Sequence, residues 1–175
     1  AKAAKTTKKK AKTKKRGKRD LGEYSLVVVE SPSKAKTIKK YLGRGYQVVA
    51  SNGHVKDLPK SKLGVDLKSG SFTIDLVPLT GKKDKIERIR ELAKGAQKIF
   101  LAPDPDREGE AIAYHLAEEI GNKKKIFRVL FNAVTKSAVT QAIATPVELD
   151  KRKYDSQKTR RVLDRLVGYK ISPIL

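Results

Sequence analysis

The sequence predicts an α/β protein with a Rossmann-like, mainly parallel sheet flanked by helices. Short apolar runs rich in branched aliphatic residues, such as 26–29, are typical of strands buried on both faces of a parallel sheet. The main runs are followed by a polar turn and then by a segment in which apolar residues recur with helical spacing. This alternation favours a parallel sheet joined by right-handed crossovers.

The first strand–helix unit begins with Leu26–Val29, which predicts a buried strand. Glu30–Ser33 ends this strand and supplies residues that favour the start of a helix. Apolar residues then recur with helical spacing up to Leu42, and Gly43 ends the helix. Further along, the pattern predicts a strand at 46–50, a polar, turn-rich loop at 51–64, a strand at 72–77 and a helix at 84–94.

The second unit repeats the first in outline. It is predicted to contain a strand at 98–102, a turn at 104–108, a helix at 110–120, a strand at 127–131 and a helix at 136–144. Thr145–Pro146 breaks this pattern, and residues 154–169 form a long amphipathic helix with no strand after it. We therefore expect an α/β domain at 23–148 and, at 149–175, the first helix of a second, helical domain that is cut off.

Charge indicates the class of partner. The 175 residues include 41 Lys and Arg against 19 Asp and Glu, a formal net charge of +22. Such a surplus implies a polyanionic partner, with nucleic acid favoured over an anionic membrane. The first nineteen residues hold eleven Lys or Arg and no apolar segment to bury, so residues 1–22 are expected to be a disordered basic tail. The tail either adds salt-sensitive phosphate binding or is a solvated extension.

Composition also excludes several classes of protein. The chain has no cysteine, which excludes a disulfide framework and a zinc thiolate site and fits a cytoplasmic protein. Its longest apolar runs are about five residues, far short of the roughly 20 needed to cross a bilayer. The basic N-terminus is not followed by the apolar segment of a signal peptide. We therefore expect no membrane partner.

Acidic residues follow two of the predicted strands. Asp104, Asp106 and Glu108 alternate after the strand at 98–102, and Glu30 ends the first strand, with Lys34 one helical turn beyond it. Ligands of open α/β sheets bind at this edge, and carboxylates packed there repel one another unless a cation offsets them. Oxygen ligands with no His or Cys nearby in the sequence select a hard ion such as Mg²⁺. Acids that merely complement a helix dipole are the alternative, but three alternating acids favour the metal.

Three blocks of sequence together resemble bacterial type IA DNA topoisomerases. They are Val28–Lys36, Ser51–Pro59 and Ala102–Ala113, the last resembling the acidic motif of the Toprim domain of these enzymes. The likeness continues through Val129–Asn132 and Thr159–Tyr169, so that it covers nearly everything from residue 26 onwards. The acidic motif alone would also allow primases, type II topoisomerases and nucleases of the same superfamily.

The resemblance implies a Toprim fold and a role for each matching residue. Glu30, Asp104, Asp106 and Glu108 would bind Mg²⁺ at the catalytic site, and Glu30 would also lie beside the scissile phosphate. Lys34 would contact that phosphate and help to protonate the leaving 3′ oxygen. The other implied DNA contacts are His54, Arg107, Arg161, Val162 and Arg165, the last three on the first helix of a DNA-gating domain.

For His54 and for Asp164, a purely structural role is an equally good interpretation. His54 could equally be a residue that packs its own loop. Asp164, which lies among the arginines of the last helix, could equally form an ion pair on the helix face with Arg160 or Arg161.

Type IA enzymes cleave one DNA strand by attack of a tyrosine, which forms a 5′-phosphotyrosyl link. None of the six tyrosines of this chain lies in a segment that resembles that motif. We therefore expect a magnesium and phosphate half-site without its nucleophile, inactive alone, in a cytoplasmic, nucleoid-associated bacterial enzyme.

The expected partners of this half-site are single-stranded DNA, negatively supercoiled duplex DNA and the remaining domains of the same polypeptide, in a monomer. The alternatives are a stand-alone Toprim nuclease or primase-like enzyme and a non-catalytic DNA-binding module.

Overall fold

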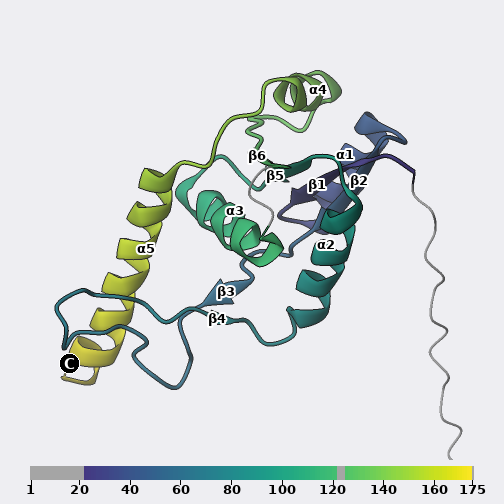
Figure 1. Ribbon diagram of the computed structural model, residues 1–175. Coiled ribbons are helices and arrows are strands. Elements are labelled where there is room, and N and C mark those ends of the chain that lie inside the picture. The colour runs from purple at the N-terminus through teal and green to yellow at the C-terminus, as the bar shows by residue number, and fades with distance from the viewer. Residues whose placement is uncertain (1–21, 122–124, 175) are drawn as a thin grey trace, which may run out of the picture.

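The computed structural model describes residues 22–121 and 125–174, and its centre is a four-stranded sheet (Figure 1). The strands are β1 (Ser25–Val29), β2 (Tyr46–Ala50), β5 (Ile99–Ala102) and β6 (Ile126–Arg128). They lie in the order β2-β1-β5-β6, and every neighbouring pair is parallel. The parallel sheet confirms the predicted fold class, whereas the predicted basic tail falls, except for Gly22, outside the described residues.

Local chemistry explains the first strand–helix–strand unit. The side chains of Leu26–Val29 are fully buried, as the apolar run predicts. Helix α1 (Pro32–Leu42) begins where the Ser31 hydroxyl accepts a hydrogen bond from the Lys34 backbone N–H and ends at Gly43, whose φ is 75°. The predicted helix and its predicted end are therefore both confirmed.

Helices cover both faces of the sheet. Helix α2 (Lys83–Gly95) and helix α3 (Arg107–Ile120) pack against one face, where Leu26 and Val28 of β1 meet Ile112 of α3. Helix α1 and helix α4 (Lys136–Ala144) cover the other face, where Val27 and Val29 meet side chains of both helices. Alternate residues of β1 therefore point into two different cores, which is why the whole strand is apolar.

A hairpin-like loop and the last helix form a third, smaller cluster beside the sheet. Strand β3 (Lys56–Asp57) pairs antiparallel with β4 (Val77–Pro78). Helix α5 (Lys151–Leu166) packs along α3 and, through Val162, against Leu58 and Val65 of the loop. Figure 1 shows α5 standing to one side of the sheet, with the loop crossing its C-terminal half. A π-helical turn, Val167–Ile171, follows α5.

Several predicted elements differ from the structure. The strand predicted at 72–77 is wrong, because this stretch forms only an isolated bridge between Val65 and Ile74 before β4 begins, and Phe72 has a φ of 50° that no strand accommodates. The strand predicted at 127–131 is shorter, because it ends at Arg128. The last helix begins at Lys151 rather than 154, because the Asp150 carboxylate caps its start. Within the described residues, no helix has the length and apolar character to cross a membrane.

Candidate metal and nucleic-acid site

The acidic residues lie where the order of the sheet reverses. β1 and β5 are the two central strands; the chain leaves β1 through α1 toward β2 and leaves β5 through α3 toward β6, on opposite sides. The two strands end in register, since Val29 pairs with Ala102. Glu30 and the turn that carries Asp104 therefore begin side by side, at the edge where open α/β sheets bind their ligands.

Glu30, Lys34 and Asp104 form the centre of this site. The Lys34 ammonium makes an ion pair with the Asp104 carboxylate. Partial burial raises the pKa of Glu30, and the negative charge of Asp104 raises it further, while Lys34 acts in the opposite direction. The site therefore combines carboxylates that repel one another with one cation at the start of α1.

Asp106 and Glu108 reach the same edge from α3. This helix begins at Arg107, three residues earlier than predicted, because the Asp106 carboxylate accepts a hydrogen bond from the Gly109 N–H at 2.6 Å and caps it. Glu108 lies in the first turn and is 2.9 Å from Nε2 of His54. The negative charges of Asp106 and Glu108 both raise the pKa of Glu30, after the larger effects of burial and Asp104. Capping thus accounts for Asp106 locally, and the predicted turn at 104–108 ends at Asp106.

The donor chemistry of this edge suits Mg²⁺, although the carboxylates are not gathered into a ready-made cage. Among the described residues, no group of three or more His, Asp or Glu side chains lies close enough together to hold a metal ion. Four carboxylates nevertheless face one edge. Burial first, and then the negative charges of Asp104, Asp106 and Glu108, raise the pKa of Glu30 there. Oxygen-only donors of this kind suit a hard divalent cation. The side chains at this edge are therefore chemically suited to bind Mg²⁺. In this structure the Asp104 carboxylate contacts the Lys34 ammonium instead.

The arginines of α5 hold the loop that carries His54. Both guanidinium nitrogens Nε and Nη2 of Arg161 contact the Asp57 carboxylate, the former at 2.9 Å. Burial raises the pKa of Asp57, but the hydrogen bonds from Arg161 and from the Leu58 N–H outweigh it and lower that pKa. Arg165 donates to the carbonyl of Pro59 at 2.9 Å. Two of the predicted DNA contacts therefore already bind protein groups.

The other predicted residues of α5 have different environments. Val162 is buried against Leu58, so its side chain packs in the interface between helix and loop. Arg160 lies 4.0 Å from Asp164 on the exposed face of the helix, which bears out the ion-pair alternative for this pair. Asp164 is exposed and lines the adjacent cavity.

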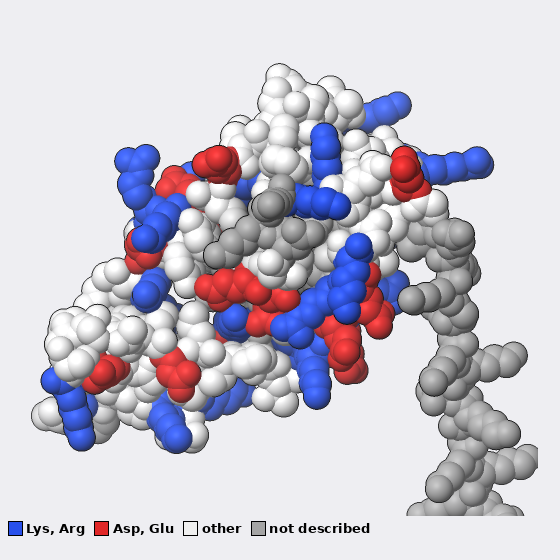
Figure 2. Space-filling view, in the orientation of Figure 1, with Lys and Arg blue, Asp and Glu red and all other residues white. Residues whose placement is uncertain are grey.

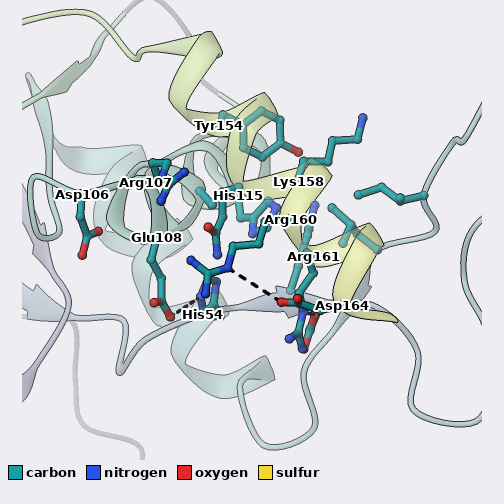
Figure 3. Close-up of a pocket in the computed structure, with 16 residues that line it drawn as sticks. His54, Asp106, Arg107, Glu108, His115, Tyr154, Lys158, Arg160, Arg161 and Asp164 are labelled. Atoms are coloured by element: carbon teal, nitrogen blue, oxygen red, sulfur yellow. Dashed lines mark hydrogen bonds and ion pairs between the residues drawn. The ribbon is translucent and has the colours of Figure 1, made fainter. Parts of the chain in front are cut away.

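A cavity of about 560 Å³ lies between α3, α5 and the loop (Figure 3). Its wall includes His54, Arg107, Glu108, Arg160, Arg161 and Asp164. Figure 3 shows these side chains together with His115, and Tyr154 of α5 lies at the top of the view. The cavity continues from Asp106 and Glu108, so a strand of nucleic acid could contact the acidic edge and the arginine helix at once.

Charge on the surrounding surface is mixed rather than uniformly basic. Lys56 pairs with Glu118 at 3.0 Å and with Glu119 at 2.8 Å, and Arg90 of α2 pairs with Glu119. In the view of Figure 2, Lys and Arg side chains likewise lie next to Asp and Glu side chains over the middle of the molecule. Around these ion pairs, basic side chains therefore lie beside acidic ones instead of forming a continuous basic patch.

Sequence reasoning missed two buried charged residues next to the acidic turn. Arg128 is 1% exposed and Glu110 is 2% exposed, and the Arg128 Nε lies 2.9 Å from a carboxylate oxygen of Glu110. A signal was present, because Arg128 interrupts the apolar run Ile126–Phe131 and a charge inside a buried strand needs a partner. His115, buried without a hydrogen-bond partner among the described residues, was also missed and gave no such signal.

Comparison with known families identifies the class of protein. The Toprim domain family matches residues 25–134, and the chain belongs to this family. Among solved structures, it is similar to full-length topoisomerase I from Thermotoga maritima, with 45% sequence identity and a TM-score of 0.80. The match covers 86% of this chain and 26% of that one, so the chain spans about a quarter of the length of that topoisomerase. The Toprim fold and the relationship to topoisomerase I implied by the sequence blocks are thus confirmed.

Proposed function

We propose that this chain is the magnesium-binding Toprim part of a type IA DNA topoisomerase. Such an enzyme relaxes negatively supercoiled DNA by cleaving one strand through a 5′-phosphotyrosyl link and rejoining it, without ATP. The observation that carries the proposal is the juxtaposition of Glu30, Lys34 and Asp104 at the point where the strand order reverses. The similarity to topoisomerase I supports the same conclusion.

Each residue at this edge has a proposed task. Glu30, Asp104, Asp106 and Glu108 would hold Mg²⁺, which supplies charge neutralisation at the DNA phosphates during cleavage and rejoining. Lys34 lies in the first turn of α1 and already binds a carboxylate oxygen. Its ammonium can therefore bind a phosphate oxygen in the same place and give a proton to the leaving 3′ oxygen.

Most of the proposed DNA contacts lie on the cavity wall. His54 and Arg107 lie there beside Glu108, and Arg161 of α5 joins them. Arg165, one turn further along α5, lies outside the lining and donates to the Pro59 carbonyl. To bind a DNA phosphate, Arg161 would have to give up or share its hydrogen bonds with the Asp57 carboxylate. We propose that a flexible single strand of DNA can adapt to this arrangement. Val162 would contribute by packing α5 on the loop. We further propose that the enzyme is a cytoplasmic, nucleoid-associated monomer.

The nucleophile would come from another part of the same polypeptide. Among the tyrosines of this chain, Tyr24 donates a hydrogen bond to the Leu92 carbonyl, and the rings of Tyr114 and Tyr154 stack on each other with their centroids 4.4 Å apart. These tyrosines have structural contacts that explain them. We therefore propose that the chain alone does not cleave DNA.

The test uses a full-length enzyme that carries this chain. Asp104→Asn combined with Asp106→Asn removes two negative charges while the Asn at 106 can still cap α3. Magnesium-dependent relaxation of negatively supercoiled plasmid should be lost, whereas the matched pair Glu87→Gln and Glu91→Gln, which are exposed on α2 and do not line the cavity, should relax normally. Equal relaxation by both variants would refute the metal assignment.

A non-catalytic DNA-binding module is the second candidate, because Asp106 is explained as a helix cap and Asp104 as the partner of Lys34. Titration of the 175-residue chain with Mg²⁺, followed by NMR of the carboxylate carbons, separates the two candidates. Shifts at Glu30 and Asp104 support the metal site. Shifts at neither residue, in the presence and absence of a single-stranded oligonucleotide, favour the module.

A further inference from the structure

Arg128 of β6 is buried in the middle of a network of backbone carbonyls. Besides the ion pair with Glu110, its Nη1 donates to the carbonyl oxygens of Pro103 at 2.9 Å and Leu101 at 3.2 Å, and its Nη2 donates to that of Asp104 at 2.7 Å. A buried ion pair is weak evidence for stability, since apolar residues of the same volume often stabilise as well. What these directional bonds provide is a fixed arrangement of the groups they join.

One side of the network is the acidic turn. Pro103 and Asp104 follow β5 and precede α3, where the chain has left the sheet. The carbonyl of Asp104 is bound by Arg128, and the carboxylate of the same residue reaches Lys34. A Cβ on Gly109 would lie only 2.0 Å from that carbonyl oxygen, so α3 closes tightly over it. Arg128 therefore fixes the backbone from which a central carboxylate of the proposed site projects.

The other side of the network is the start of the arginine helix. The second carboxylate oxygen of Glu110 accepts a hydrogen bond from the Asp150 N–H at 2.7 Å. The Asp150 side chain in turn accepts from the N–H groups of Arg152 at 2.9 Å and Lys153 at 3.3 Å, which caps α5. Glu110 thus hydrogen-bonds both Arg128 and Asp150, the residue that caps α5, and so joins Arg128 to the first turn of that helix.

We infer that Arg128 and Glu110 are positioning residues that couple the acidic turn to the first turn of α5. Through them, the carboxylates at the end of β5 and the arginines of α5 are held in one mutual arrangement. The coupling itself follows from the contacts; its consequence for metal and DNA rests on the proposed function. Neither residue faces the cavity, so neither would touch the substrate.

The primary experiment measures hydrogen exchange in the 175-residue chain with Arg128→Lys. Lysine keeps the charge beside Glu110 but cannot bridge the carbonyls that the planar guanidinium joins. We expect the amides of Arg152 and Lys153, which Arg128 does not touch, to exchange at least about tenfold faster. The amide of Val28 in the central strand should keep its rate, which separates loss of positioning from global destabilisation.

Controls keep the outcome decisive. Arg90→Lys makes the same chemical change at an arginine whose side chain is half-exposed and pairs with Glu119, and it should leave exchange at α5 unaltered. If Arg128→Lys does not fold, Glu110→Gln replaces it, because its amide oxygen can still accept from the Asp150 N–H while its NH₂ faces Arg128. Unaltered exchange at 152 and 153 in whichever variant folds, or equal acceleration at Val28, would overturn the inference.

A second measurement tests the consequence of this coupling for metal binding. Arg128→Lys should weaken the apparent Mg²⁺ affinity of the chain by roughly tenfold, as loss of residues behind metal ligands does elsewhere. If the wild-type chain shows no Mg²⁺-dependent shifts, the metal assignment fails, whereas the exchange result still decides whether the coupling exists. If the wild type binds Mg²⁺ and the variant binds it equally well, the coupling does not reach the site.

Discussion

His115 should make the folded protein lose stability as the pH falls from 6.5 toward 4. The imidazole is buried between α3 and α5, with Tyr154 edge-on at 5.7 Å, and neither ring nitrogen has a hydrogen-bond partner within the described ranges. Burial lowers the pKa of His115 from 6.5 to about 4. Of the nearby charges, Glu118 and Asp57 oppose this lowering, and His54 and Lys56 add to it.

The direction of this change in stability follows from proton uptake by the unfolded chain. Between pH 6.5 and about 4 the unfolded chain binds a proton at this residue and the folded chain does not, so the free energy of unfolding falls as the pH falls. The full difference in the pKa of His115 corresponds to about 3 kcal/mol, of which about 2 kcal/mol is lost by pH 5. Above pH 6.5 the neutral imidazole contributes no further dependence.

The assay compares urea unfolding of the wild type and His115→Phe at pH 7.5 and pH 5, followed by circular dichroism. Phenylalanine keeps an aromatic ring against Tyr154 and removes both the titration and the unpartnered nitrogens. The wild type should lose about 2 kcal/mol more than the variant between these two pH values. Because all other groups titrate in both proteins, equal losses would refute the assignment of a depressed pKa to His115.

Three further predictions concern single contacts, and urea unfolding at pH 7.5 measures each. Gly109→Ala should destabilise by about 3 kcal/mol, because the new Cβ would lie 2.0 Å from the carbonyl oxygen of Asp104. Asp57→Ala should cost about 1 kcal/mol by removing the half-exposed pair with Arg161, and this cost should shrink in 1 M NaCl. Thr135→Ala should cost about 1 kcal/mol, because the Thr135 hydroxyl caps α4.

A matched variant and three contrary outcomes test the physical reason given for each of these predictions. Gly121→Ala tests backbone strain without crowding, since Gly121 has a φ of 73° and no atom within 4 Å of its hypothetical Cβ; it should cost about 1 kcal/mol. A cost at Gly109 no larger than this would mean that α3 can move away from the turn. An Asp57→Ala cost that is the same at low and high salt would argue against an ion pair, and a neutral Thr135→Ala would show that the cap is replaced by water.

Elements specified by local chemistry were predictable. The strand at 46–50 and the helix at 136–144 have the predicted bounds, and α1 ends at the predicted glycine. Buried parallel strands need apolar residues on both faces, and helices need caps, so both leave a pattern along the sequence. The alternation of apolar residues at 72–77 led to the wrong prediction of a strand. Ile74 and Leu76 pack in the cluster beside α5 and do not belong to a face of a sheet.

By itself, the sequence determined the α/β architecture, the position of the acids at the end of a strand and the kinship with topoisomerase I. Only the tertiary structure decided that β1 and β5 are neighbours, which brings Glu30 and Lys34 to Asp104 from about seventy residues away along the chain. It also decided that Arg128 holds the acidic turn from within. The physical reason is that strand order and buried hydrogen bonds join residues distant in sequence, and no local pattern of apolar spacing or capping encodes such partners.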